Sequence, residues 1–293
     1  LFGNQSLLVQ CAGKILQSGH RITAVVSHAK DITDWAAANG IRVLEPGADL
    51  PSKLRHTRID WLLSISYLSI IPDEVLSLAT RGAVNFHDGP LPAYAGLNTP
   101  VWARINQAAT HAITWHFMET GIDEGDILLS RSFAIDEEDT AFSLNAKCFE
   151  AAIDSFDELL VKLTSGDVTG KAQDLSRKGY YARHQRPDNL GFIDFSKPAD
   201  AIIALVRGLD HKNYWNPLTT AKIAVNGQIF TAQGVEKTDQ SGVAGRVTGV
   251  TGNSLTVACA DGAVRLTGLR LADGTNPGAL LSDIIAEGAK VET

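Results

Sequence analysis

The sequence lacks the patterns that define several large protein classes. It has only three cysteines among 293 residues, Cys11, Cys148 and Cys259, and no CxxC pair. Because disulfide frameworks and zinc fingers need closely spaced cysteines, we expect each of the three to be a small buried apolar residue. No uncharged apolar run reaches about 18 residues, and the first residues lack the basic-then-apolar layout of a signal peptide. We therefore expect a soluble, cytoplasmic protein with no membrane partner.

Positive charge is not in excess either. The chain has 26 Lys and Arg against 33 Asp and Glu, and its formal net charge is −7. The main basic groupings are Arg177-Lys178 and the segment 183–186. Because binding to nucleic-acid phosphates needs clustered Lys and Arg, we expect no nucleic-acid partner. The composition, 44% hydrophobic and 20% charged, is that of a globular protein long enough for roughly two domains.

Residues 1–180 alternate short apolar runs with amphipathic stretches, which is typical of βα units around a parallel sheet. The pattern predicts an α/β fold with a Rossmann-like, doubly wound sheet. Because Leu1 is not Met and lies inside an expected strand, we expect further residues upstream. Strands are expected at 1–3, 22–27, 41–44, 61–66, 83–87, 113–118 and 127–135, and helices at 6–17, 31–38 and 139 to about 163.

Residues 181–293 are expected to form a second, smaller domain. The polar segment 164–187 shows no periodicity and is interpreted as a linker. A helix is expected from 196–198 to 206, and strands that alternate with Asn-Gly, Gly-Asn and Asp-Gly turns follow it. The strands are expected at 220–225, 228–236, 245–251, 254–259 and 262–269, and they indicate a small closed, OB-like β-barrel.

Side chains capable of chemistry are concentrated between residues 85 and 126. Asn85 and His87 end an expected parallel strand, and their spacing places them on one face of it. Ligands bind at the carboxyl edge of such sheets. The turn 121–126 supplies Asp123 and can aim a carboxylate back at the first pair. An amide, an imidazole and a carboxylate together can stabilise an oxyanion and move a proton.

Spacing alone leaves other interpretations open. His87 at a strand end can be a hydrogen-bonded structural residue, and Asp123 can serve the turn alone. Because His87, His111 and His116 show neither HxxxH nor HxH spacing, we expect no metal site. The segment 3–6 follows the first strand but lacks GxGxxG, which argues against a dinucleotide cofactor.

Several motifs resemble those of the 10-formyltetrahydrofolate-dependent formyltransferase family. They are Asn85-Phe86-His87 with Leu91-Pro92, Gly96 and Pro100, then Thr114-Trp115-His116-Phe117 and the segment 121–128. The segments 192–197 and 242–269 are similar to the carboxyl-terminal barrel of the methionyl-tRNA enzymes in this family. The resemblance therefore extends over nearly the whole chain. It implies transfer of a formyl group from 10-formyltetrahydrofolate to an amine.

The resemblance also assigns roles to residues. It implies that Asn85, His87 and Asp123 are catalytic, with Asp123 preferred to Asp126 because Asp123 occupies the family's Asp-x-Gly position. A proton can pass through His87 or through a water held by Asp123. A pterin slot is implied between the segment 64–71 and the backbone of 116–123. The expected folate-binding residues are Ser64, Ile65, Leu68, Ser69, Ile71, His116, Phe117 and Gly121.

The nature of the acceptor is a separate question, because this sequence departs from the family near the site entrance. Gly89 replaces the usual serine after the motif histidine, and Ala95-Gly96 replaces the usual Arg-Gly. The segment 190–293 has nine Lys and Arg against ten Asp and Glu, whereas a domain that grips tRNA should be basic. The combination of the segment 87–92 (His-Asp-Gly-Pro-Leu-Pro) with Trp115-His116, the acidic balance and the expected missing start of the chain looks most similar to formyltransferase modules of nonribosomal peptide and polyketide assembly lines. This resemblance implies that the acceptor is an aminoacyl group on a carrier protein. Two alternatives are a formyltetrahydrofolate hydrolase and a catalytically idle folate- or carrier-binding module.

Overall fold

The computed structural model describes residues 1–166, 168–278 and 281–292, and the chain forms two compact units within them. The first unit contains residues 1–97, 111–133 and 146–181. The second contains residues 98–110, 134–145 and 182–293. The proposed division into a catalytic domain over 1–180 and a carboxyl-terminal domain over 181–293 stays a prediction.

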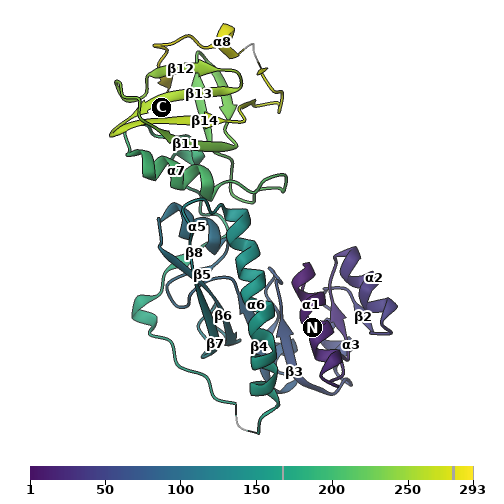
Figure 1. Cartoon of the computed structure of the whole chain (residues 1–293). Coiled ribbons are helices and arrows are strands. Elements are labelled where there is room, and N and C mark those ends of the chain that lie inside the picture. Colours follow the sequence, from purple (N-terminus) through teal and green to yellow (C-terminus); the bar gives the residue numbers. More distant parts are fainter. Residues whose placement is uncertain (167, 279–280, 293) are drawn as a thin grey trace. The chain divides into compact units, whose positions relative to one another are not determined.

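The first unit is a mixed α/β layer structure, as predicted (Figure 1). Its helices are α1 (Ser6–Gln17), α2 (Lys30–Ala38), α3 (Leu50–Leu54), α4 (Asp73–Leu76), residues 146–164 of α6 (Ala141–Thr164) and the 3-10 turn η1 (Leu175–Arg177). Its strands are β1 (Val25–Val26), β2 (Val43–Leu44), β3 (Ile59–Ser64), β4 (Ala79–His87), β5 (Ala95–Gly96), β6 (Thr110–Phe117), β7 (Ile127–Ala134) and β8 (Tyr180–Tyr181).

The central sheet is built around the first residues of the chain. Phe2 pairs in parallel with Val26 of β1 and with Ser64 of β3, so it joins the β1–β2 pair to the strands β3-β4-β6-β7. β3 and β4 are parallel, and β4 and β6 are antiparallel. The parallel strands all end at one edge of the sheet, and this edge carries the ligand site in open α/β sheets.

Apolar side chains alternate between the two faces of this sheet, because successive residues of a strand point to opposite sides. Val25, Leu63 and Val84 pack into one core, and their neighbours Val26, Leu62 and Ala83 pack into the other. The first core is closed by α1, α2 and α6, and the second by α3 and α4. Helices therefore cover both faces, as the doubly wound prediction requires.

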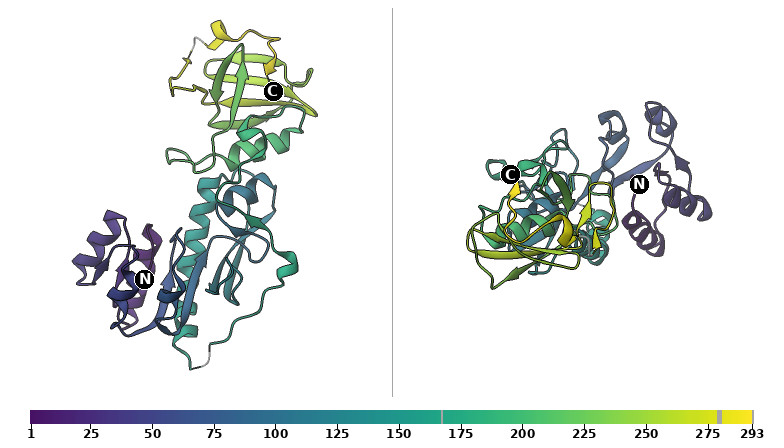
Figure 2. Two further views of the ribbon diagram at one scale, coloured as in Figure 1. Left: turned by 180° about the vertical axis from the view of Figure 1, so that it is seen from behind. Right: turned by 90° about the horizontal axis from the view of Figure 1, so that it is seen from above.

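The second unit is rich in antiparallel strands, which Figure 2 shows in green to yellow from two sides. Two four-stranded sheets, β15-β10-β9-β16 and β11-β14-β13-β12, form a small barrel-like domain, as expected. Its helices are α5 (Thr99–Ile105), η2 (Asp188–Gly191), α7 (Ala199–Gly208) and α8 (Leu281–Ile284). Its strands are β9 (Lys222–Val225), β10 (Gln228–Thr231), β11 (Gly234–Thr238), β12 (Val247–Thr251), β13 (Ser254–Cys259), β14 (Gly262–Thr267), β15 (Arg270–Leu271) and β16 (Val291–Glu292).

Two sequence-based predictions of secondary structure are wrong. The strand expected over 228–236 is two strands, β10 and β11, which belong to different sheets. At the start of β11, a Cβ on Gly234 would lie 2.4 Å from Thr267 Oγ1, so a larger residue would require the Thr267 side chain on β14 to move. The segment 164–187 is not a linker throughout, since residues 170–181 are hydrogen-bonded to the first unit's loops, as described below. Among the described residues, no helix is both long and apolar enough to cross a bilayer.

Candidate active site

The pairing register between β4 and β6 places the polar residues at the end of β4 beside polar residues of β6. Asn85 lies opposite His116, and His87 lies opposite Thr114, across the antiparallel β4–β6 pair. Directly opposite residues share one face of a sheet, so the four side chains lie together. The alternate residue Phe86 faces the other way and packs on Trp115 with ring centroids 5.2 Å apart. The same apolar packing that builds the core thus presents the polar side chains on the other face.

Asp123 joins this group from the turn between β6 and β7. It has a φ of 56°, in the left-handed region that non-glycine residues rarely adopt. Its Oδ2 accepts a 2.8 Å hydrogen bond from Gly96 N and lies 3.7 Å from His87 Nδ1, and its Oδ1 lies 3.5 Å from His116 Nε2. The structure therefore brings the predicted residues Asn85, His87 and Asp123 together, and adds His116 to them.

The carboxylate of Asp123 is held ionised by its surroundings. Its side chain is 12% exposed, and burial alone would raise its pKa. The neighbouring His87, the hydrogen bond with His116 and the Gly96 N–H outweigh burial and lower the pKa of Asp123 far below the ordinary value. Asp123 is thus a fixed negative charge between two imidazoles at neutral pH.

His87 is oriented by the loop that follows β4. Its Nε2 lies 2.6 Å from the carbonyl oxygen of Tyr94, and because a carbonyl oxygen only accepts, Nε2 carries a proton. Nδ1 is then the nitrogen that can gain or lose a proton, and it faces Asp123. A protonated Nδ1 would be stabilised by that carboxylate. This geometry suits proton transfer or donation to a developing negative charge.

Three further buried side chains fix the loop 88–96. His111 Nε2 donates to Asp88 O at 2.7 Å, and Cys148 Sγ lies 3.7 Å from the same oxygen. Thr114 Oγ1 donates to Gly89 O at 2.8 Å. Burial lowers the pKa of His111, so that it stays neutral behind the loop. His111 is therefore a structural histidine of this loop.

The segment 170–181 holds both loops of the site, a role that its sequence pattern does not indicate. Gln173 Nε2 donates to the carbonyl oxygens of Asp123 and Gly125 at 2.9 and 2.7 Å. Lys178 Nζ donates to Ile122 O and pairs with Glu124. β8 pairs with β5 directly after the loop 88–94. A sequence signal was present in Gly179, where a Cβ would lie 2.1 Å from Ala93 O.

The residues expected to bind folate fall into two groups. Ile65 and Ile71 are buried in the two cores, Ser64 is buried beside Asn85 in the β3–β4 register, and the Phe117 ring stacks on Trp61. Leu68 and Ile70, by contrast, are 58% and 84% exposed, and Ser69 between them is exposed too. Gly121 is half-buried, one residue before the exposed Ile122. The role of these residues in binding folate stays a prediction. In that prediction, the buried residues act through their backbone or by supporting the residues that contact folate.

Asp126 and the question of a metal-binding group are separate from the site at the end of β4. Asp126 accepts a hydrogen bond from Phe117 N through its carbonyl oxygen, whereas the side chain of Asp123 lies beside His87 and His116. Among the residues that the structure describes, no three or more His, Cys, Asp or Glu side chains form a group that could hold a metal ion.

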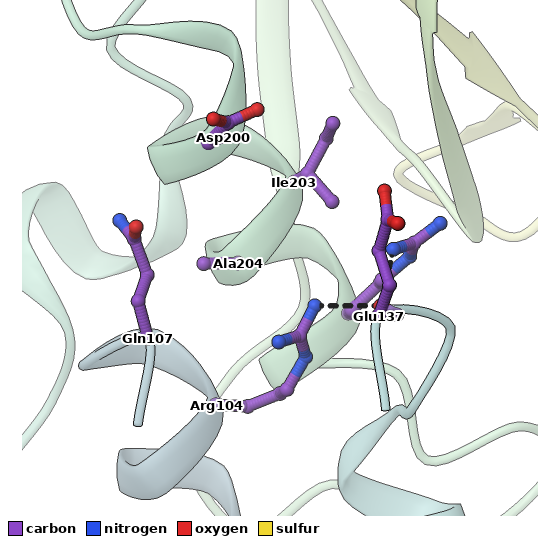
Figure 3. A pocket seen from close by; sticks show the side chains of 7 residues that line it. Arg104, Gln107, Glu137, Asp200, Ile203 and Ala204 are labelled. Carbon is purple, nitrogen blue, oxygen red and sulfur yellow. Dashed lines mark hydrogen bonds between the residues drawn. The ribbon is translucent and has the colours of Figure 1, made fainter. Parts of the chain in front are cut away.

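A cavity of about 240 Å³ lies in the second unit, between α5 and α7 (Figure 3). Arg104 and Gln107 line it from one side, and Asp200, Ile203 and Ala204 from the other. Arg104 donates to Glu137 O at 3.0 Å and to Asp139 O at 2.8 Å. Arg207 pairs with Glu138, and Asp200 pairs with Lys237. Arg104, Arg207 and Asp200 therefore all have partners within the unit.

Comparisons with known proteins give matches to both parts of the chain. A family model described as formyl transferase matches residues 4–159, and a model of the formyl transferase C-terminal domain matches residues 187–279. The fold is shared with an N-formyltransferase from Helicobacter canadensis, whose crystal structure is a complex with folinic acid and dTDP-3-aminofucose. That match has 19% identity and a TM-score of 0.73, and it covers 92% of this chain and 97% of that one.

Two further solved structures share the fold. HypX from Aquifex aeolicus, in complex with tetrahydrofolic acid, has 17% identity and a TM-score of 0.67 over 92% of this chain and 43% of that one. A 4-N formyltransferase from Francisella tularensis has 19% identity and a TM-score of 0.62 over 75% of this chain and 89% of that one. The first family model spans more than half of the sequence. The chain therefore belongs to the formyl transferase family.

Proposed function

We propose that the protein transfers a formyl group from 10-formyltetrahydrofolate to a primary amine. The observation that carries this proposal is the cluster of Asn85, His87 and Asp123 at the carboxyl edge of a formyl transferase domain. Support for the donor comes from relatives of the same fold that were solved with folinic acid or tetrahydrofolic acid. The exposed apolar side chains of Leu68, Ile70 and Ile122 offer a surface that a flat pterin would cover.

The residues of the site supply each element that formyl transfer needs. Bound formyl-folate supplies an electrophilic formyl carbon on a nitrogen leaving group. As an amine attacks that carbon, negative charge develops on the formyl oxygen. The Asn85 amide N–H and a proton on His87 Nδ1 can donate to this oxygen, and Asp123 stabilises the charged imidazole. The proton of the amine then passes to the folate nitrogen through His87 or through a water held by Asp123, and the bond between that nitrogen and the formyl carbon breaks, which releases tetrahydrofolate and the N-formyl product.

We infer further that the acceptor is an aminoacyl group on a carrier protein. The near balance of charge over 190–293, nine basic against ten acidic residues, does not favour a tRNA acceptor. The replacement of the usual serine by Gly89 and of the usual arginine by Ala95 removes polar side chains from the loop that borders the site. Nonribosomal peptide synthesis in the cytoplasm is the setting that this acceptor implies.

The proposal is tested by product analysis with 10-formyltetrahydrofolate and three acceptors, with a fourth reaction that contains none. The acceptors are aminoacyl carrier proteins, a dTDP-amino sugar of the kind bound by the Helicobacter relative, and charged initiator tRNA. We expect N-formyl product on the carrier-bound amine, detected by mass spectrometry. Product on the sugar alone would contradict the acceptor and leave formyl transfer standing. Equal rates of formate release with and without every acceptor would make the protein a hydrolase.

The tRNA reaction gives a separate expectation. Formylation of initiator tRNA should be negligible, because tight binding needs several phosphate contacts from a basic surface. Formylation that falls steeply as salt is raised from about 50 to 200 mM would show such contacts and would exclude the carrier-protein acceptor as the sole one.

The segment 170–181 yields a mutational prediction. In a Gln173→Ala variant, the turn that carries Asp123 loses two hydrogen bonds to its backbone. We expect the formyl-transfer kcat to fall roughly tenfold, because small displacements of a catalytic group are costly. Gln228→Ala, at an exposed site on β10, is the matched control and should keep the wild-type kcat. An unchanged kcat for Gln173→Ala would show that the turn holds Asp123 in place without the two hydrogen bonds from Gln173.

A further inference from the structure

The ring of Tyr181 stacks on the ring of Tyr94, and the carbonyl oxygen of Tyr94 is the atom that holds His87 Nε2. We propose that Tyr181 is a positioning residue for His87: its ring keeps Tyr94 in place and thereby keeps the imidazole in the orientation that formyl transfer needs. The proposal rests on the function proposed above. It assigns a role to one side chain of β8, in addition to the backbone pairing of β8 with β5.

The segment 94–96 makes the backbone contacts that orient two catalytic side chains. The carbonyl oxygen of Tyr94 lies 2.6 Å from His87 Nε2, and Gly96 N donates to Asp123 Oδ2 at 2.8 Å. Because both contacts come from the backbone, their geometry depends on how firmly this short segment is held. A shift of the segment would move the acceptor for His87 and the donor to Asp123 together.

The backbone pairing of β5 with β8 is close but short. Leu97 N donates to Tyr181 O at 2.9 Å, and a Cβ on Gly96, whose φ is 101°, would lie 2.2 Å from the same oxygen. β5 has only two residues, and Tyr94 directly precedes it. The strand pair therefore does not include Tyr94, so the contacts of the Tyr94 ring contribute to holding its carbonyl group.

The ring of Tyr94 contacts two other rings. It stacks on Tyr181 with centroids 5.3 Å apart and an interplanar angle of 24°, and it meets His111 edge to face at 5.8 Å and 88°. His111 belongs to the buried strand β6 and is 1% exposed, so it is a fixed surface. If the Tyr181 ring is removed, the contact with His111 is the one of these two that remains, and the carbonyl group of Tyr94 gains freedom to move.

Such freedom should act directly on the imidazole of His87. Nε2 carries a proton in contact with Tyr94 O both in the neutral ring and in the charged ring, so this contact persists while Nδ1 exchanges its proton. When the carbonyl oxygen moves away, the ring can rotate and Nδ1 no longer faces Asp123. Small misplacements of a catalytic group are costly for the rate.

The contact is measured without turnover by ¹H–¹⁵N NMR on the full chain with ¹⁵N-labelled histidine. The Nε2–H of His87, assigned by its loss in His87→Gln, should exchange slowly with water because it is buried and hydrogen-bonded. Tyr181→Ala should speed this exchange at least about tenfold, whereas Tyr181→Phe, which keeps the stacked ring, should change it less than about twofold. Unchanged exchange in Tyr181→Ala, or equally fast exchange in Tyr181→Phe, would overturn the proposal.

Steady-state kinetics test the consequence for the reaction. Tyr181→Ala should lower kcat for formyl transfer about tenfold, with KM for the folate changed less than about threefold, and Tyr181→Phe should recover most of the loss. In a His87→Gln background, Tyr181→Ala should cost less than about threefold, because its route of action is already lost. Equal costs in both backgrounds would overturn the proposal and leave Tyr181 a packing residue.

Tyr214→Ala is the matched control, because Tyr214 of the second unit also stacks on a ring, that of Phe142, with centroids 5.5 Å apart. This variant should keep the wild-type kcat, and an equal fall in both alanine variants would overturn the proposal. Should Tyr181→Ala prove unstable, Tyr181→Leu replaces it, since leucine keeps apolar bulk without a flat face. If the wild type forms no N-formyl product, the proposed function fails, while the exchange of the His87 Nε2–H still decides whether Tyr181 positions His87.

Discussion

Replacement of His87 by alanine is expected to lower the rate of formyl transfer at least about a hundredfold. The side chain is 5% exposed, and its two nitrogens are committed to different tasks. Nε2 is fixed on Tyr94 O at 2.6 Å, and Nδ1 lies 3.7 Å from Asp123 Oδ2. Alanine removes both the proton that can reach the formyl oxygen and the base that can take it back. The folate KM should change little, because the ring acts on charge that develops in the transition state.

Steady-state kinetics with 10-formyltetrahydrofolate and the acceptor from the product screen measure this loss. His56→Ala, at an exposed position in the first unit, is the matched control and should keep the wild-type rate. Thermal unfolding of both variants separates loss of chemistry from loss of fold. If the His87→Ala protein is folded and keeps the wild-type turnover, His87 has a purely structural role, which its position at the end of a strand also allows.

Much of the secondary structure in both units was predictable because its signals are local. The helix expected over 6–17 is α1 with the same bounds, and the strand expected over 254–259 is β13 with the same bounds. Period-two alternation on β4 places Asn85 and His87 on one face of the sheet and Phe86 on the other, and this pattern is visible in three consecutive residues. The pairing register between β4 and β6 cannot be read from consecutive residues, because it depends on where the chain comes back to pair with β4. The contact between Asn85 and His116 therefore emerged only from the structure.

The segment 170–181 shows why the remainder was missed. Its ties to the site run through backbone groups and through single polar side chains such as Gln173 and Lys178, which produce no hydrophobic period. A polar stretch without a period is read as a linker when only the sequence is available. The division of β10 from β11 was missed for a related reason, since the sheet that each strand joins depends on pairing partners distant in the sequence.

Asp123→Asn is expected to lower formyl transfer by at least about a hundredfold as well. Asparagine keeps the shape of the side chain and can still accept the Gly96 N–H, but it carries no charge. Without that charge, a proton on His87 Nδ1 loses its stabilising partner 3.7 Å away. Asp126→Asn is the matched control, three residues further along the same turn. A similar loss in both variants would mean that the turn, and not the charge of Asp123, matters for the rate.

The same substitution has a consequence for stability that depends on pH in a defined direction. The folded-state pKa of Asp123 lies below its unfolded value of about 3.9, so its ionised form stabilises the fold above about pH 4. That contribution is lost as the pH falls through the folded-state value. Urea unfolding should show the wild type more stable than Asp123→Asn by about 1.5 to 3 kcal/mol at pH 7, with the gap narrowing below about pH 4. A gap that stays constant or widens between pH 5 and pH 3 would mean that Asp123 is not held as a carboxylate by its two histidines and Gly96, and the electrostatic role assigned to it in catalysis would lose its basis.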